Sequence, residues 1–255
     1  MPSRDELIKH LDTLGKMEEF KQMIDLLPEE LLNHSNDHIL IFLKGIGWQG
    51  IKEYDKAIAC FNRAIDISDD NPFARDYRGQ AWAEKQELHK AIEDYTRSIE
   101  IKDDMGIVYY NRGNAWLHLE EYDKAIEDYS RAIWLEETLY SAYYNRGLAY
   151  DGIQEFDKAI ADYTQTIYLK NAHTGALTNR GLLLSDKGEY DDSIADFTRV
   201  IELKIKDEEA YNNRGIAWYR KREYVKAMAD FEKAIEIKPG YADAIFNREE
   251  TMKKI

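Results

Sequence analysis

The sequence YYNRG occupies residues 109–113 and returns at residues 143–147. Shorter versions follow, with TNRG at residues 178–181 and NNRG at residues 212–215. The glycine of this motif recurs every 34 residues, at Gly45, Gly79, Gly113, Gly147, Gly181 and Gly215. Self-similarity at one fixed period indicates a repeat protein, so we expect six equivalent structural units.

Other positions keep the same phase. A small residue follows each glycine by 12 positions, and the set is Ala57, Ala91, Ala125, Ala159, Ser193 and Ala227. An aromatic residue follows by 16 positions, and the set is Phe61, Tyr95, Tyr129, Tyr163, Phe197 and Phe231. Within a copy the apolar spacing of three and four predicts amphipathic helices. Each copy is therefore expected to be two antiparallel helices joined by a polar turn such as residues 151–155.

The glycine is expected to serve packing. Glycine inside a helix costs about 1 kcal/mol relative to alanine, so its recurrence requires a compensating gain. Gly147 lies on the same helical stripe as Tyr143 and Tyr150, facing the partner helix. The missing side chain lets the two backbones approach, with Ala159, or Ser193 in a later copy, as the expected counterpart. One such pair cannot bury its apolar face alone, so neighbouring pairs must stack into a solenoid.

These positions together resemble the tetratricopeptide repeat. The resemblance rests on the period of 34 residues, the large–Gly–aromatic pattern of the first helix and the aromatic–Ala–aromatic pattern of the second. Pro239 also stands at the family's late proline position in the last copy. The resemblance implies an all-α fold, a right-handed superhelical solenoid of antiparallel helix pairs. It also implies that the first helices line a concave groove.

The two ends depart from the pattern, which predicts three regions. Residues 1–37 are expected to form an N-terminal capping helix pair, a degenerate repeat in which Pro28 interrupts the second helix. Residues 38–241 form the six tandem repeats. Residues 242–255 are expected to be a C-terminal solvating helix, because Glu249 replaces the glycine there and no second helix follows it.

Composition limits the function. The formal net charge of −14 repels nucleic-acid phosphates and anionic lipid heads, so neither nucleic acid nor membrane is an expected partner. No run of residues is long and apolar enough to cross a bilayer. The N-terminal residues lack the apolar segment of a secretory signal, and Cys60 has no second cysteine to pair with. A cytoplasmic location is the resulting expectation.

An arginine precedes each later glycine, and an aspartate precedes each later aromatic residue of the second helix. The first copy lacks both, having Lys44 and Cys60 instead. This covariation predicts ion pairs at the rim of each helix junction, worth about 0.2–1 kcal/mol each. The alternative is that the arginines bind an acidic ligand. Between the two possible pairings, we expect each aspartate to hold the arginine of the next repeat, which would join Asp230 to Arg248.

A peptide-binding groove is the functional hypothesis. Asparagines recur on the open face of the first helices, and amides suit the N–H and C=O groups of an extended peptide. We expect these amides to have no protein partner, although local polar contacts are the alternative. The predicted groove residues are Asn111, Asn145, Asn179, Asn213, Asn247, Asp76, Tyr110, Asn114 and Tyr144. Acidic residues on this face, including Glu84, predict a preference for neutral or basic segments. The apolar start of the face predicts either a ligand pocket or docking of the N-terminal helices.

No catalytic function is expected. His34 and His38 could share a helix face, but two ligands are too few for a metal site, and no cofactor motif is present. The sequence therefore predicts a non-catalytic scaffold that binds a protein or peptide segment. Two alternatives stay open at this point: a sensor that responds to a ligand or peptide signal, and a module that self-associates.

Overall fold

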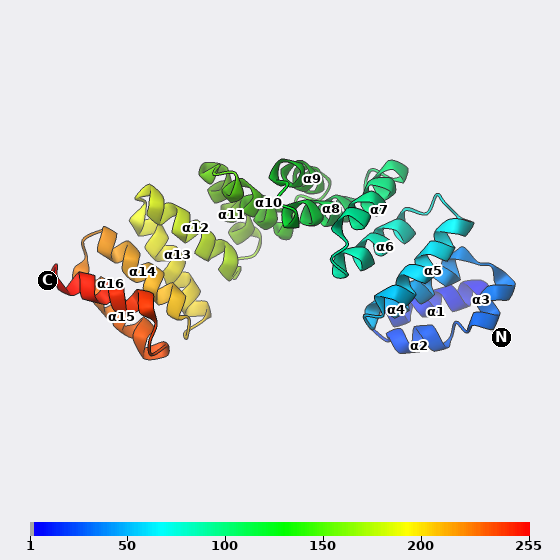
Figure 1. Ribbon diagram of the computed structural model, residues 1–255, viewed down its shortest axis with the longest axis horizontal. Helices are drawn as coiled ribbons and strands as arrows, with labels where there is room; N and C mark the ends of the chain where they lie inside the picture. Colours follow the sequence, from blue (N-terminus) through cyan, green and yellow to red (C-terminus); the bar gives the residue numbers. More distant parts are fainter. Residues whose placement is uncertain (1–2) are drawn as a thin grey trace. The chain divides into compact units, whose positions relative to one another are not determined.

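The computed structural model describes residues 3–255, except for the side chains of residues 34 and 35. Within that range the chain is all-α, and no strand is present. It divides into two compact units, Met1–Glu137 with α1–α9 and Thr138–Ile255 with α10–α16. In both units consecutive helices pack as pairs, as Figure 1 shows. The prediction of an all-α solenoid of helix pairs is confirmed.

In the first unit the helices are α1 (Arg4–Lys16), α2 (Phe20–Asp25), α3 (Glu29–Ser35), α4 (His38–Gly50), α5 (Tyr54–Ile67), α6 (Pro72–Glu84), α7 (Leu88–Ile101), α8 (Gly106–His118) and α9 (Tyr122–Leu135). In the second unit they are α10 (Tyr140–Gly152), α11 (Phe156–Leu169), α12 (Thr174–Lys187), α13 (Tyr190–Leu203), α14 (Glu208–Arg220), α15 (Tyr224–Ile237) and α16 (Ala242–Met252). We call the first helix of each pair the A helix and the second the B helix. The A helices from α4 onward are the even-numbered ones.

The chain reverses between the A and B helices through one residue in the left-handed backbone region. Gln154, with a φ of 62°, does this between α10 and α11. The same conformation recurs every 34 residues, at Glu18, Lys52, Gln86, Glu120, Gly188 and Arg222. Because Glu18 falls in this series, α1 and α2 form a helix pair of the same kind as the six regular ones.

Each recurring glycine makes room for an aromatic ring. A Cβ placed on Gly147 would lie 2.7 Å from Cε1 of Tyr163, whose ring is fully buried. The other five glycines face the aromatic residue 16 positions later in the same way. The small counterpart predicted from the sequence is also present, because Ser193 donates a 2.7 Å hydrogen bond to the carbonyl of Gly181. The glycine is thus a packing residue, and the ring is what fills the space.

The N-terminal segment solves the same packing problem differently. At the glycine and aromatic positions of this degenerate pair stand Leu11 and Leu27, and both are completely buried. Two branched side chains of equal size replace the combination of a void and a ring. The second helix α2 ends at Asp25, and Pro28 stands at the N-cap position of a further helix, α3. The segment therefore holds three helices where a pair was expected. The division into a cap, six repeats and a terminal helix stays a prediction.

The ion pairs form within a repeat, so the predicted register is wrong. Asp230 accepts from Nε and Nη2 of Arg214 at 2.8 and 2.7 Å. The same two-point contact joins Arg78 to Asp94, Arg112 to Asp128, Arg146 to Asp162, and Arg180 to Asp196. Nε of Arg248 is buried, with no hydrogen-bond partner among the residues described. The register follows from packing, since a B helix lies directly against its own A helix.

The arginine also reaches the preceding repeat. Nη1 of Arg180 donates to Oγ1 of Thr164 at 3.0 Å, and Nη1 of Arg214 donates to Oγ1 of Thr198 at 3.1 Å. Each of these side chains therefore ties together three helices. In the first regular repeat, Lys44 instead pairs with Glu29 of α3 at 2.5 Å. Burial raises the pKa of the Cys60 thiol to about 11, which marks it as a packing residue.

Candidate functional site

The candidate site lies in the first unit on the side of α4, α6 and α8 that their B helices leave uncovered. We call this side the A-helix face. Side-chain caps define where two of these helices begin. Asp37 accepts from the backbone N–H of Ile39 at 3.0 Å, and Asn71 accepts from that of Phe73 at 3.0 Å. Pro72 adds a fixed φ at the first position of α6.

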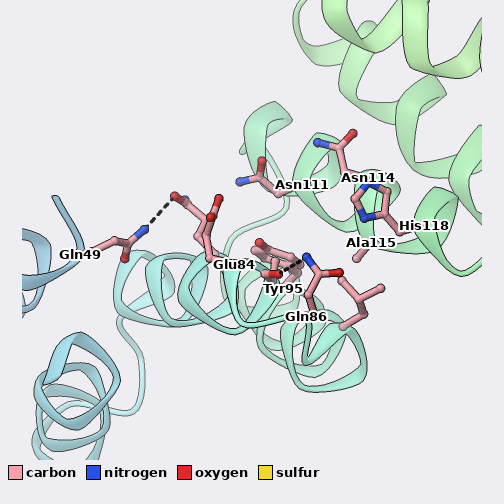
Figure 2. Close-up of a pocket in the computed structure, with 11 residues that line it drawn as sticks. Gln49, Glu84, Gln86, Tyr95, Asn111, Asn114, Ala115 and His118 are labelled. Carbon is pink, nitrogen blue, oxygen red and sulfur yellow. Dashed lines mark hydrogen bonds between the residues drawn. The ribbon is translucent and has the colours of Figure 1, made fainter. Parts of the chain in front are cut away.

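A cavity of about 310 Å³, which we call the polar pocket, opens on this face. Its polar lining includes Gln49 from α4, Gln80 and Glu84 from α6, Gln86 from the turn after α6, and Asn111, Asn114 and His118 from α8. In Figure 2, Gln49 stands on one side and Asn111, Asn114 and His118 on the other, with Glu84 between them. No lysine or arginine lines the pocket among the described residues.

A buried carboxylate orients two of the amides. Asp76 is 3% exposed and accepts from Nδ2 of Asn111 at 3.2 Å and from Nε2 of Gln80 at 3.1 Å. Burial raises the pKa of Asp76, and the two amide hydrogen bonds partly oppose that shift. Each of these amides uses one N–H on Asp76, and its oxygen has lone pairs that can accept a further hydrogen bond.

The pocket is therefore rich in hydrogen-bond acceptors. Oε1 of Gln80 accepts one long bond of 3.4 Å from Gln49, and the carboxylate of Glu84 adds a negative charge. A carbonyl oxygen has two lone pairs, so Gln80 can accept a further bond. Such a lining suits a ligand with N–H donors and disfavours an anion.

The predicted site residues divide between the two units. Asp76, Tyr110, Asn111 and Asn114 belong to the first unit, where Asn111 and Asn114 line the same pocket. The Tyr129 hydroxyl donates to Oδ1 of Asn114 at 2.8 Å, and its ring lies 6.0 Å from that of Tyr110. Asp76 lies beneath the pocket rather than in its lining.

The remaining five residues lie in the second unit. Tyr144 of α10 packs 4.5 Å from the ring of His173, and Nδ2 of Asn179 approaches the Tyr144 hydroxyl at 3.5 Å. Asn145 is half-buried on α10. Asn213 lines a small cavity of about 90 Å³ beside Arg220, and Asn247 lies on α16.

The expectation that the asparagine amides have no protein partner is wrong at Asn111, Asn179 and Asn247. Asn111 donates to Asp76, Nδ2 of Asn179 donates to the Tyr144 hydroxyl at 3.5 Å, and Nδ2 of Asn247 donates to Oδ1 of Asn212 at 3.0 Å. In each case the acceptor is 35 residues earlier, on the preceding A helix. Adjacent A helices are close enough there for a short amide to bridge them. These three asparagines therefore join repeats, which the sequence analysis gave as the alternative.

Sequence reasoning missed four amide and imidazole side chains of the pocket: Gln49, Gln80, Gln86 and His118. A signal for one of them was present. Gln80 and Asn114 both follow the packing glycine directly, where later repeats have Leu148, Leu182 and Ile216. That change from apolar to amide marks the polar pocket. The His34 side chain lies outside those that the structure describes, so the expectation that His34 and His38 form no metal site stays a prediction. The described residues contain no group of three metal-binding side chains.

The repeats of this chain match known protein families. Family models described as tetratricopeptide repeat match residues 49–71, 107–139, 140–173, 174–204 and 208–241, which is more than half of the chain. A search of curated proteins by sequence gives no match. Across residues 3–255, every helix is too short or too polar to span a bilayer.

Solved structures agree with the family models. MamA is 28% identical over 64% of this chain and 95% of its own, with a TM-score of 0.61. YrrB, described as a TPR protein with an unusual peptide-binding site, is 22% identical over 74% of this chain and 97% of its own, with a TM-score of 0.69.

A third structure covers nearly the whole chain. The C-terminal part of a TPR repeat-containing protein from Cytophaga hutchinsonii is 18% identical over 94% of this chain and 98% of its own, with a TM-score of 0.78. Its likeness and that of YrrB show the fold alone. Repeats of this type are generally non-catalytic scaffolds that bind proteins or peptides. The chain belongs to the tetratricopeptide repeat family.

Proposed function

We propose that the A-helix face of α4, α6 and α8 binds an extended peptide segment of a partner protein. The observation that supports this is the polar pocket, where three consecutive A helices bring together amide, imidazole and carboxylate groups. A peptide backbone presents a donor and an acceptor at each residue, which is what such side chains pair with. The description of YrrB, a protein of the same fold, as having a peptide-binding site supports the same use of the fold here.

The partner segment is neutral or basic. Asp76 fixes the amides of Gln80 and Asn111 so that their oxygens remain as acceptors, and Glu84 is exposed at the pocket. The whole chain carries a net charge of −14, which repels acidic segments. Backbone N–H groups and lysine or arginine side chains supply donors for these oxygens and for the carboxylate of Glu84.

A selection from a random library of short peptides, followed by affinity measurement, tests the proposal. We expect the wild-type chain to enrich peptides that contain basic residues. Glu84→Ala and His118→Ala should each weaken the binding of the selected peptide about 5- to 10-fold. This is the effect of losing one hydrogen bond worth about 1 kcal/mol. Both side chains are exposed, and Glu84 accepts a surface hydrogen bond from the Tyr54 hydroxyl at 3.2 Å, so the free energy of unfolding should change by less than about 1 kcal/mol.

His89→Ala is the matched control, because His89 is an exposed histidine on the B helix α7. Equal losses of affinity for His118→Ala and His89→Ala would contradict the proposal. So would a library in which no peptide is enriched. Light scattering with and without the peptide separates the proposal from self-association. A dimer formed through this face would dissociate when the peptide is added.

A further inference from the structure

A second cavity lies beside the polar pocket in the first unit. It has a volume of about 480 Å³ and lies between α1, α2, α4 and the Tyr77 side chain of α6. Its lining is mainly apolar, with Leu11, Phe20, Met23, Leu43 and Ile46. We call it the apolar pocket. The sequence left open whether this end of the face is a ligand pocket or a docking site for the N-terminal helices, and the helices dock there while leaving a cavity.

The walls of the apolar pocket are built by close packing. Phe20 lies directly against the backbone of Gly50, which leaves no room for a side chain there. At the equivalent position, five residues after the packing glycine, α6 has Glu84 and α8 has His118. Charged groups are confined to Asp12 and Lys16, which pair with each other at 2.6 Å on the surface of α1. The pocket interior is thus uncharged, and its size falls in the range of small-molecule sites, about 300–1000 Å³.

The two pockets meet at Gln49, which lines both of them. Its Oε1 atom is buried and accepts no hydrogen bond from the described residues. The amide nitrogen of Gln49, Nε2, donates one long hydrogen bond of 3.4 Å to Gln80. The amide group is therefore weakly held and can turn. An occupant that satisfies this oxygen needs an N–H donor beside an apolar group. A hydrocarbon ligand lacks that donor, whereas a peptide has one at every residue.

We propose that the apolar pocket takes a bulky apolar side chain, of leucine, methionine or phenylalanine size, from the same peptide that binds the polar pocket. The inference rests on the proposed function and specifies its ligand. The backbone N–H next to the anchoring residue bonds to Gln49, and the chain continues over Gln80 and Asn111. The recognised segment therefore combines one apolar anchor with a neutral or basic stretch.

Gly15 offers a clean way to close the pocket. It lines the cavity near the end of α1, and a Cβ placed on it would lie 3.6 Å from Sδ of Met23, an ordinary van der Waals distance. Gly15→Ala therefore fits without filling the cavity, while Gly15→Leu places a branched side chain inside it. Both substitutions favour the helix over glycine, so the fold is preserved and Gly15→Ala is the matched control.

The pocket is tested by NMR of the protein labelled on its methionine methyl groups. Met23 is 1% exposed and lines the cavity, so its methyl resonance reports on occupancy. N-acetyl-leucine amide at millimolar concentration should shift this resonance in the wild type and in Gly15→Ala, but not in Gly15→Leu. N-acetyl-glutamine amide should leave it unchanged. An unmoved Met23 resonance in the wild type, or an equal shift in Gly15→Leu, would overturn the inference.

The peptide selected from the library tests the link between the pockets. Replacing its apolar residue by alanine should weaken binding at least 10-fold to the wild type and to Gly15→Ala. The same replacement should have little effect on binding to Gly15→Leu. A selected peptide that depends for its affinity on His118 of the protein, but on none of its own apolar residues, would contradict this inference. That result would still support the proposed function. Enrichment of no peptide contradicts both, so the two failures are distinguishable.

Discussion

The helix junctions and the A-helix face follow opposite rules. At the junctions, five repeats place the same arginine against the same aspartate, and six place a glycine against an aromatic ring. On the A-helix face, the residue after the packing glycine changes from Gln80 and Asn114 to Leu148, Leu182 and Ile216. Positions that recur hold neighbouring helices together. Positions that vary give each part of the face its own chemistry, and the polar pocket lies where they are amides.

The largest loss of stability is expected from closing a junction. A Cβ on Gly215 would lie 2.6 Å from Cε1 of Phe231, whose ring is 1% exposed, so Gly215→Leu must push α14 and α15 apart. We expect a loss of about 3 kcal/mol in the free energy of unfolding, measured by urea titration. Gly15→Leu is the comparison, because the same change at Gly15 meets an open cavity. Similar losses for the two variants would show that the recurring glycine has no special packing role.

A smaller loss is expected from breaking one junction ion pair. Asp196→Ala leaves the guanidinium of Arg180, whose side chain is 20% exposed, without its two-point acceptor, so we expect a loss of about 2 kcal/mol. Asp157→Ala removes an exposed partner of Lys187 and should cost less than about 1 kcal/mol. If both variants lose the same stability in urea, the buried pairs do no more than surface pairs.

The smallest effect is expected on the A-helix face, at Asp76. Burial raises the pKa of its carboxyl above the ordinary 3.8, so ionisation of Asp76 opposes folding. Its contribution to stability is full below that ordinary value and is lost as the pH rises through the raised pKa. Asp76→Asn removes the ionisable carboxyl and keeps one of its two acceptor oxygens, so the stability difference between the wild type and the variant should depend on pH and stay smaller than the loss at Asp196. Urea titrations should show the wild type losing stability relative to Asp76→Asn as the pH rises from mild acid to pH 7. A difference that is independent of pH would contradict the assignment.

The repeat pattern predicted the helix pairs closely. The spacing of Tyr143, Gly147 and Tyr150 predicted one helix, and α10 spans Tyr140–Gly152. The following run predicted the second, and α11 spans Phe156–Leu169. Prediction was possible here because helical periodicity and the fixed period of the chain are both local properties of the sequence.

The sequence was less informative about which neighbours a side chain meets. The period of the arginines and aspartates is the same for both possible pairings, and Arg248 at the end favoured the wrong one. The first copy lacks both the arginine and the aspartate, having Lys44 and Cys60 in their places. Loss of both residues in one copy is the pattern that pairing within a repeat predicts. The asparagines carried the same ambiguity, since a residue on the open face can bond to a ligand or to the preceding A helix.

The polar pocket was foreseen only in part for a related reason. Asn111 was predicted from the recurrence of the asparagines and Asn114 from its place on the open face of the first helix. Gln49 lies on α4, the A helix of the first regular repeat, and recurs nowhere. Its place in both pockets depends on where α1 and α2 end and on how Phe20 packs against Gly50. Those contacts join segments about thirty residues apart and leave no periodic trace in the sequence.

A crystal structure of the wild-type chain with the library-selected peptide tests the central claim most directly. We predict an extended peptide over α4, α6 and α8, with its N–H groups on the oxygens of Gln80 and Asn111 and an apolar side chain beside Met23. The junction contacts of Arg78 and Arg112 should be unchanged. A peptide bound to the B helices, or on the second unit alone, would contradict the account.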